Sequence, residues 1–255
     1  AYSRANYKFP DAQIFPHSSF QEEFGYLKKH PHLNAKLAGE GYILGPITGD
    51  HFLVYVADKC TRQYVATERT LNIMMFDMAP EVASHFYMES CPDKEDAAAA
   101  KYMTAASGID NLVPGAIIDD RAFDPCGYSM NAILYGSYTT VHITPEQECS
   151  YASFETSTPL TSYSALINNV LSTFRPMRVV VTLTGDAEGI AQVVENPIDN
   201  KTIHVPGFAA YNRSSASFTK VEGDCVVSMG NWEISAEHDP SELREHRKTN
   251  RIQSI

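Results

Sequence analysis

Four short stretches of strand-forming residues follow one another between Ile117 and Thr156, and they constrain the fold more than any other feature of the chain. Each stretch is rich in β-branched or aromatic residues, and the connections between them are short and carry Pro, Gly or Ser. Because connections this short join antiparallel neighbours, the pattern predicts a meander of adjacent strands. The predicted strands cover 117–123, 128–135, 138–144 and 150–156.

Helical patterns lie on both sides of this meander. Ser19 and Glu22 have the spacing of a capping box for a helix over 18–30, and Gly108 is placed to end an Ala-rich helix over 96–107. Helices and strands are segregated rather than strictly alternating, so the predicted fold class is α+β. The other predicted helices cover 80–88, 163–174 and 187–194, and the other predicted strands cover 41–45, 51–57, 70–78, 179–183 and 224–232.

Composition limits the class of partners. Asp and Glu total 31 against 20 Lys and Arg, a net charge of -11, so the chain repels nucleic-acid phosphates and anionic lipid. The five cysteines are scattered without a Cys-x-x-Cys pair, so neither a metal site nor a disulfide framework is expected. No long apolar run and no secretory signal occurs, so we expect a cytoplasmic protein without membrane or nucleic-acid partners.

Domain organisation follows from where the apolar periodicity stops. Residues 1–235 are expected to form one folded region. Residues 236–255 are polar and charged without an apolar period, which predicts a disordered tail. The sequence begins at Ala1 without a Met, which suggests a fragment or a processed chain.

Two reactive side chains fall on neighbouring strands of the meander. Strands joined by a tight connection pair side by side, so Ser129 and His142 are expected to face each other across a ladder. A hydroxyl beside an imidazole is suited to proton transfer. Purely structural roles for both residues, and a Ser-His-acid hydrolase with Asp124 or Glu146 as the acid, are the alternatives; the Gly-x-Ser-x-Gly elbow of many hydrolases is absent.

Three strings around these residues carry a family resemblance. Residues 124–131 read DPCGYSMN, residues 142–146 read HITPE, and residues 150–155 read SYASFE. Together they resemble the signature core of the eukaryotic-type S-adenosylmethionine decarboxylases, which are pyruvoyl-dependent. Segments within 2–23 and 107–115 fit the same family, so the resemblance covers about the first 185 residues.

This resemblance implies an enzyme, a carboxy-lyase of polyamine synthesis. The family removes CO2 from S-adenosylmethionine and so makes the aminopropyl donor for spermidine and spermine. Its electron sink is a pyruvoyl group rather than pyridoxal phosphate or a metal, and this group forms when a precursor cleaves itself at an internal Ser. Loss of CO2 leaves electrons at Cα that the group must accept.

The resemblance also implies roles for four residues. His142 matches the base that takes the Cα proton of the ester intermediate during self-cleavage. Ser129 matches the group that hydrogen-bonds the preceding tetrahedral intermediate, as an oxyanion-hole donor does. Phe123 matches an aromatic ring that stacks on the adenine, and Glu146 a carboxylate that accepts hydrogen bonds from the ribose hydroxyls.

A separate cluster resembles an effector site. Some family members are activated by putrescine, which buried acidic residues hold between the sheets. Glu68, Thr70 and Glu155 match that cluster. Asn72 stands where some activated members carry a carboxylate, and a missing negative charge weakens the attraction for a dication. The missing charge therefore argues against putrescine activation, and surface carboxylates on a strand are the alternative to an effector site.

The implied fold is a four-layer αββα sandwich of two antiparallel sheets, incomplete at its N-terminal side. The resemblance identifies the chain as most of the large (α) chain, without the pyruvoyl-forming Ser and without the small (β) chain, its expected partner. Some members are homodimers through sheet edges and others are monomers. The alternative function is that of a catalytically inactive paralogue that activates a partner decarboxylase.

Overall fold

The computed structural model describes residues 2–31, 39–57, 67–221 and 224–234. Its first sheet is small and antiparallel, with the strand order β1–β3–β2. The predicted hairpin is confirmed, because β2 and β3 pair from Gly39 opposite Ala57 to Leu44 opposite Phe52. The strands of this sheet are β1 (Tyr2–Ala5), β2 (Gly39–Leu44) and β3 (Phe52–Ala57).

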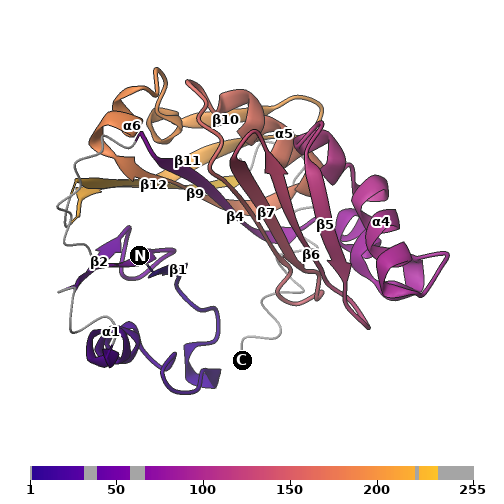
Figure 1. Ribbon diagram of the computed structural model, residues 1–255, viewed down its shortest axis with the longest axis horizontal. Coiled ribbons are helices and arrows are strands. Elements are labelled where there is room, and N and C mark those ends of the chain that lie inside the picture. Colours follow the sequence, from indigo (N-terminus) through magenta and orange to yellow (C-terminus); the bar gives the residue numbers. More distant parts are fainter. Residues whose placement is uncertain (1, 32–38, 58–66, 222–223, 235–255) are drawn as a thin grey trace.

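Helix α1 (Phe20–Lys29) covers the outer face of this small sheet (Figure 1). The predicted cap is confirmed, because the Ser19 side chain accepts a hydrogen bond from the Glu22 backbone N–H at 3.2 Å. The ring of Phe24 meets that of Tyr55 edge-on, with centroids 5.6 Å apart. Helix and sheet therefore pack through aromatic side chains.

The second sheet contains nine strands among the described residues, in the order β10–β11–β12–β9–β4–β8–β7–β6–β5. Strands β5 to β8 are adjacent and antiparallel, which confirms the predicted meander. The nine strands are β4 (Arg69–Met78), β5 (Ile117–Ala122), β6 (Tyr128–Leu134), β7 (Ser137–Thr144), β8 (Tyr151–Thr156), β9 (Pro176–Asp186), β10 (Thr202–Val205), β11 (Ala209–Lys220) and β12 (Cys225–Ile234).

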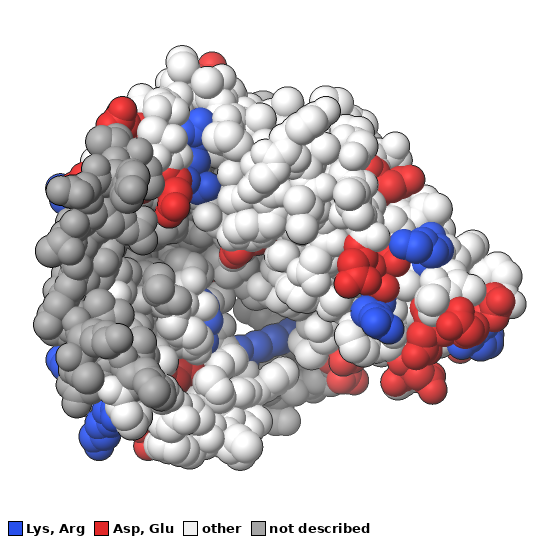
Figure 2. All heavy atoms as spheres, in the orientation of Figure 1, with Lys and Arg blue, Asp and Glu red and all other residues white. Residues whose placement is uncertain are grey.

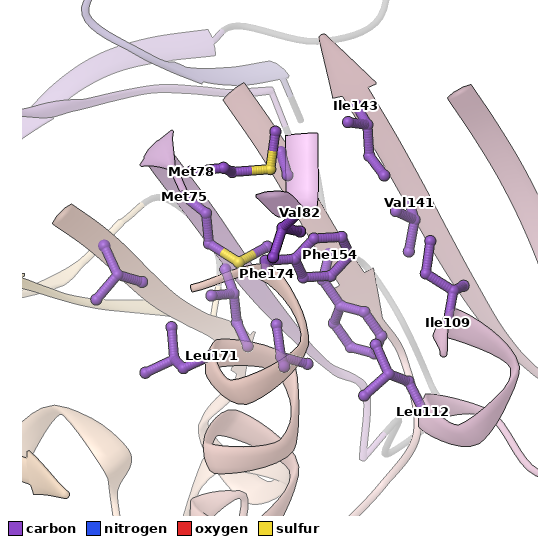
Figure 3. Close-up of a cluster of buried hydrophobic side chains, with 14 of the residues drawn as sticks. Met75, Met78, Val82, Ile109, Leu112, Val141, Ile143, Phe154, Leu171 and Phe174 are labelled. Carbon is purple, nitrogen blue, oxygen red and sulfur yellow. The ribbon is translucent and has the colours of Figure 1, made fainter. Parts of the chain in front are cut away.

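Helices cover the outer face of the large sheet and bury the main core against it (Figures 1 and 3). Figure 3 shows Phe174, from the helical side, next to Phe154 of the strands. This burial of apolar surface is the main stabilising contribution. Among the described residues, the helices after α1 are α3 (Pro80–Ala83), α4 (Asp96–Ser107), α5 (Ser164–Phe174) and α6 (Ala187–Ala191), and short 3₁₀ turns cover Pro10–Ala12, Ser84–Phe86, Met88–Ser90, Ile109–Leu112 and Pro197–Asp199.

The helix expected over 80–88 is shorter than predicted. The α-helix ends at Ala83, and two 3₁₀ turns follow. The Phe86 carbonyl accepts a hydrogen bond from Gly127 N–H at 2.8 Å, and Met88 N–H donates to the Pro125 carbonyl at 2.9 Å. These backbone groups pair with a loop of the large sheet, so they are not available to continue a helix.

A second core lies between the two sheets. Val54 and Val56 of β3 belong to one buried cluster with Met74, Val180 and Val227 of the large sheet. The order of layers is therefore α1, small sheet, large sheet, outer helices, and the predicted αββα sandwich with two antiparallel sheets is confirmed (Figure 1). In the part of the chain that the structure describes, the N-terminal sheet is the narrower one, with three strands against nine.

Two further expectations concern the C-terminal tail and membrane-spanning helices. The tail expected over 236–255 lies outside the described residues. No helix of the described part has the length and apolar character needed to cross a bilayer.

Candidate functional site

The meander divides its side chains between two faces. Met130, Val141 and Phe154 are fully buried on the face that the helices cover. Their neighbours along the strands, Ser129 and His142, point to the opposite face because side chains alternate along a strand. Polar groups of the meander therefore collect on the face directed away from the helices.

Ser129 and His142 form a direct pair on this face. They stand opposite each other in the β6–β7 register, as predicted. The Ser129 Oγ and the His142 Nδ1 are 2.9 Å apart. Within the described ranges His142 has no carboxylate partner, so the geometry gives no support to a Ser-His-acid relay.

Phe123 and Glu146 lie at the same end of the sheet as this pair. Phe123 directly follows β5 and is 50% exposed. Glu146 follows β7 in the loop to β8 and is exposed. Burial and, second, the charge of Glu146 raise the pKa of the Cys126 thiol. The Glu146 carboxylate therefore lies near the loop that Phe123 begins.

The β5–β6 loop is held in one shape by its backbone. Phe123 N–H donates to the Gly127 carbonyl at 3.1 Å, which closes the loop at its base. Gly127 has φ of 119°, a conformation that residues with a Cβ rarely adopt. The sequence DPCGYSMN therefore needs glycine at this position to aim Phe123 and Ser129 from the two sides of one loop.

The candidate effector cluster is assembled only in part. Asn72 and Glu155 are opposite each other in the β4–β8 register, and Asn72 Nδ2 donates to the Glu155 carboxylate at 3.0 Å. The Tyr138 hydroxyl donates to the same carboxylate at 2.8 Å. Burial, together with hydrogen bonding to Glu155, raises the pKa of Tyr138, and a hydrogen bond to Thr70 lowers it. Glu68 precedes β4 and is exposed.

Two tyrosines near these groups make contacts that were not predicted from the sequence. Tyr138 contacts Glu155 across β7 and β8, and the register of the meander was the signal that could have revealed it. The Tyr87 hydroxyl donates to the Pro145 carbonyl at 3.1 Å. No spacing in the sequence indicates this second contact, because it joins a 3₁₀ segment to a distant loop.

A separate hollow lies between the N-terminal layer and the large sheet (Figure 2). Its volume is about 350 Å³. Arg178 forms ion pairs with Asp50 and Asp77, and Lys8 lies 3.9 Å from Asp77. The positive and negative side chains that line this hollow therefore neutralise one another. Among the described residues, no group of three or more His, Cys, Asp or Glu is placed to hold a metal ion.

Comparisons with known proteins point to one family. A family model described as adenosylmethionine decarboxylase matches residues 1–230. The chain is 36% identical over 233 residues to the S-adenosylmethionine decarboxylase proenzyme of Dictyostelium discoideum, covering 91% of this chain and 57% of that protein. It is 41% identical over 196 residues to the proenzyme of Drosophila melanogaster, covering 71% of this chain and 53% of that protein.

A solved structure shares the fold. The crystal structure of the Trypanosoma brucei AdoMetDC-delta26 monomer matches with a TM-score of 0.60 and 26% identity, covering 92% of this chain and 86% of that one. The chain spans little more than half the length of the two curated relatives named above. A family model that matches nearly the whole chain, together with these relatives, leads to one conclusion: the chain belongs to the adenosylmethionine decarboxylase family.

Proposed function

We propose that this chain is the large (α) chain region of a pyruvoyl-dependent S-adenosylmethionine decarboxylase that is made as a self-cleaving precursor. The observation that carries the proposal is the 2.9 Å contact between Ser129 and His142, at the same sheet end as Phe123 and Glu146. Family membership supplies the reaction class. The proposed partners are S-adenosylmethionine and the small (β) chain of the same precursor, in the cytoplasm.

The proposed cofactor agrees with the residues on this face. A pyruvoyl group supplies an electrophilic carbonyl that accepts the electrons released when CO2 leaves. Ser129 and His142 are the residues of this chain that would flank it. Their chemistry fits, because a hydroxyl and an imidazole in contact can hold and move the proton that self-cleavage requires.

One tautomer of His142 is compatible with both proposed roles, that of His142 as a base and that of Ser129 as a hydrogen-bond donor. For His142 to take a proton at Nε2, its Nδ1 must carry hydrogen and donate it to the Ser129 Oγ. The Ser129 hydroxyl then keeps its own hydrogen, which it can donate to a developing oxyanion. The 2.9 Å separation of Oγ and Nδ1 is compatible with this arrangement.

Phe123 and Glu146 would bind the nucleoside. The half-exposed Phe123 ring offers a face on which an adenine can stack, a contact of roughly 1–3 kcal/mol. The Glu146 carboxylate can accept hydrogen bonds from both ribose hydroxyls, and charge-assisted bonds are about twice as strong as neutral ones. Retention of all four residues favours an active enzyme over an inactive paralogue that activates a partner.

The test uses the full-length precursor and its variants. His142→Ala should leave a single uncut chain on a denaturing gel, whereas intact-mass measurement of the wild type should give two chains. Glu146→Gln should cleave normally but raise KM for S-adenosylmethionine by roughly tenfold or more, because a charged acceptor is lost. His204→Ala, at an exposed histidine on β10, is the matched control and should cleave normally. Normal cleavage by His142→Ala would remove the role assigned to His142.

A further inference from the structure

The short segment Phe86–Met88 joins to the β5–β6 loop through its backbone. The Phe86 carbonyl accepts from Gly127 N–H at 2.8 Å, and Met88 N–H donates to the Pro125 carbonyl at 2.9 Å. Between them, Tyr87 forms an isolated antiparallel bridge with Cys126. The segment therefore extends the sheet locally and fixes the loop that begins at Phe123.

The Tyr87 side chain of this segment reaches a second loop, between β7 and β8. The Tyr87 hydroxyl donates to the Pro145 carbonyl at 3.1 Å, one residue before Glu146. Burial raises the pKa of Tyr87, and the nearby Cys126 and Glu146 raise it further. The Phe86–Met88 segment thus contacts both loops that carry the proposed nucleoside-binding residues. The backbone of Phe86 and Met88 contacts the β5–β6 loop, and the Tyr87 hydroxyl contacts the β7–β8 loop.

The Tyr87–Pro145 contact lies next to the backbone of Glu146. Within the described ranges, the Glu146 carboxylate has no hydrogen bond or ion pair with another protein side chain. Its place is therefore set by the backbone of its loop, in which the Glu146 carbonyl accepts a hydrogen bond from Cys149 N–H at 3.1 Å. Pro145 has no N–H to donate, so its carbonyl is its only backbone hydrogen-bonding group, and that carbonyl is held by Tyr87.

We propose that Tyr87 is a positioning residue that sets the separation between Phe123 and Glu146 and thereby the affinity for the nucleoside part of the substrate. The inference rests on the proposed function. Tyr87 itself does not touch the reacting atoms: it acts through the β7–β8 loop. Loss of its hydroxyl should weaken substrate binding and leave the chemistry of self-cleavage at Ser129 and His142 intact.

The experiment compares Tyr87→Phe with Tyr211→Phe in the full-length enzyme. Tyr211 is a matched control, because its hydroxyl also donates to a proline carbonyl, that of Pro176, at 2.7 Å, in another part of the sheet. Tyr87→Phe should raise KM for S-adenosylmethionine about three- to tenfold, the effect of one net hydrogen bond, with kcat within about twofold and complete self-cleavage. Tyr211→Phe should lower the melting temperature and leave KM unchanged.

A double-mutant cycle separates positioning from a general structural effect. In Tyr87→Phe/Glu146→Gln, KM should equal that of Glu146→Gln alone within about twofold, because the residue being positioned has already lost its charge. If the double variant showed the product of the two single KM increases, the positioning role alone would be overturned. An unchanged KM in Tyr87→Phe, while the wild type is active, would also overturn it. A wild-type precursor that neither cleaves nor decarboxylates S-adenosylmethionine would overturn the proposed function and the role of Tyr87 with it.

Discussion

A buried hydroxyl on helix α4 supports the strands of the candidate site from behind. Thr104 Oγ1 donates to the Asp120 carboxylate of β5 at 2.6 Å and lies 2.7 Å from the Tyr128 hydroxyl of β6. Lys101 Nζ also donates to Asp120 at 2.6 Å. Burial raises the pKa of Tyr128, so its hydroxyl keeps its proton and needs an acceptor. Tyr128 directly precedes Ser129, so this network anchors β6, the strand that carries Ser129.

Thr104→Val keeps the shape of the side chain and removes its hydroxyl. A hydrogen bond to a charged group contributes about 1.5–3 kcal/mol, and a buried hydroxyl left unpaired costs about 1–3 kcal/mol. The expected loss of stability is the sum, about 2.5–6 kcal/mol, a large share of the 5–15 kcal/mol typical of a folded domain. Lys101 remains bonded to Asp120 in the variant, so the carboxylate keeps one partner.

Urea unfolding of the full-length protein measures this loss. The matched control is Thr139→Val on β7, whose buried Oγ1 donates only to Thr156 Oγ1, at 2.9 Å. Thr156 keeps Thr158 and the Tyr138 carbonyl as partners, so the control should lose only about 1 kcal/mol. Equal losses in the two valine variants would refute the reasoning, because the charged acceptor and the unpaired tyrosine would then contribute nothing.

Two predictions concern charge near the site. Because burial and Glu146 raise the pKa of Cys126, alkylation of this thiol by iodoacetamide should be slow at about pH 8 and accelerate above about pH 9. Glu146→Gln should speed the alkylation of Cys126 at about pH 8, measured by peptide mass spectrometry. An unchanged rate would contradict the effect of the Glu146 charge on this thiol. Because Glu155 already accepts from two neutral donors and Asn72 adds no charge, putrescine should not change the decarboxylation rate of the full-length enzyme. Asn72→Asp should create a response, and a several-fold activation of the wild type would show that this reasoning is wrong.

The meander could be predicted from the sequence because its information is local. Short turns and β-branched runs fix the order of β5 to β8, and the register across one tight connection brings Ser129 opposite His142. The capped helix α1 was equally local, since Ser19 and Glu22 are close in sequence. In these parts, local patterning and tertiary packing agree.

The elements that were missed depend on distant partners. Strand β11 contains small polar residues, and every second side chain from Asn212 onward is exposed. Its sequence therefore has little of the apolar alternation that predicts a strand. It forms through its pairing with β12. The segment after Ala83 looks helical by composition, but hydrogen bonds to the β5–β6 loop change its backbone. Contacts of this kind override local propensity and leave no periodic signal.

The meander also bears on when the site forms during folding. Phe123, Ser129, His142 and Glu146 all come from consecutive strands and their connecting loops, whereas β4 must pair with β8 and β9 across long stretches of chain. Pairings between near neighbours in sequence lose little loop-closure entropy and tend to form quickly. We therefore expect the arrangement around Ser129 and His142 to be complete before the distant strands have docked. The self-cleavage proposed above would then be timed by the folding of one hairpin series rather than by closure of the whole sandwich.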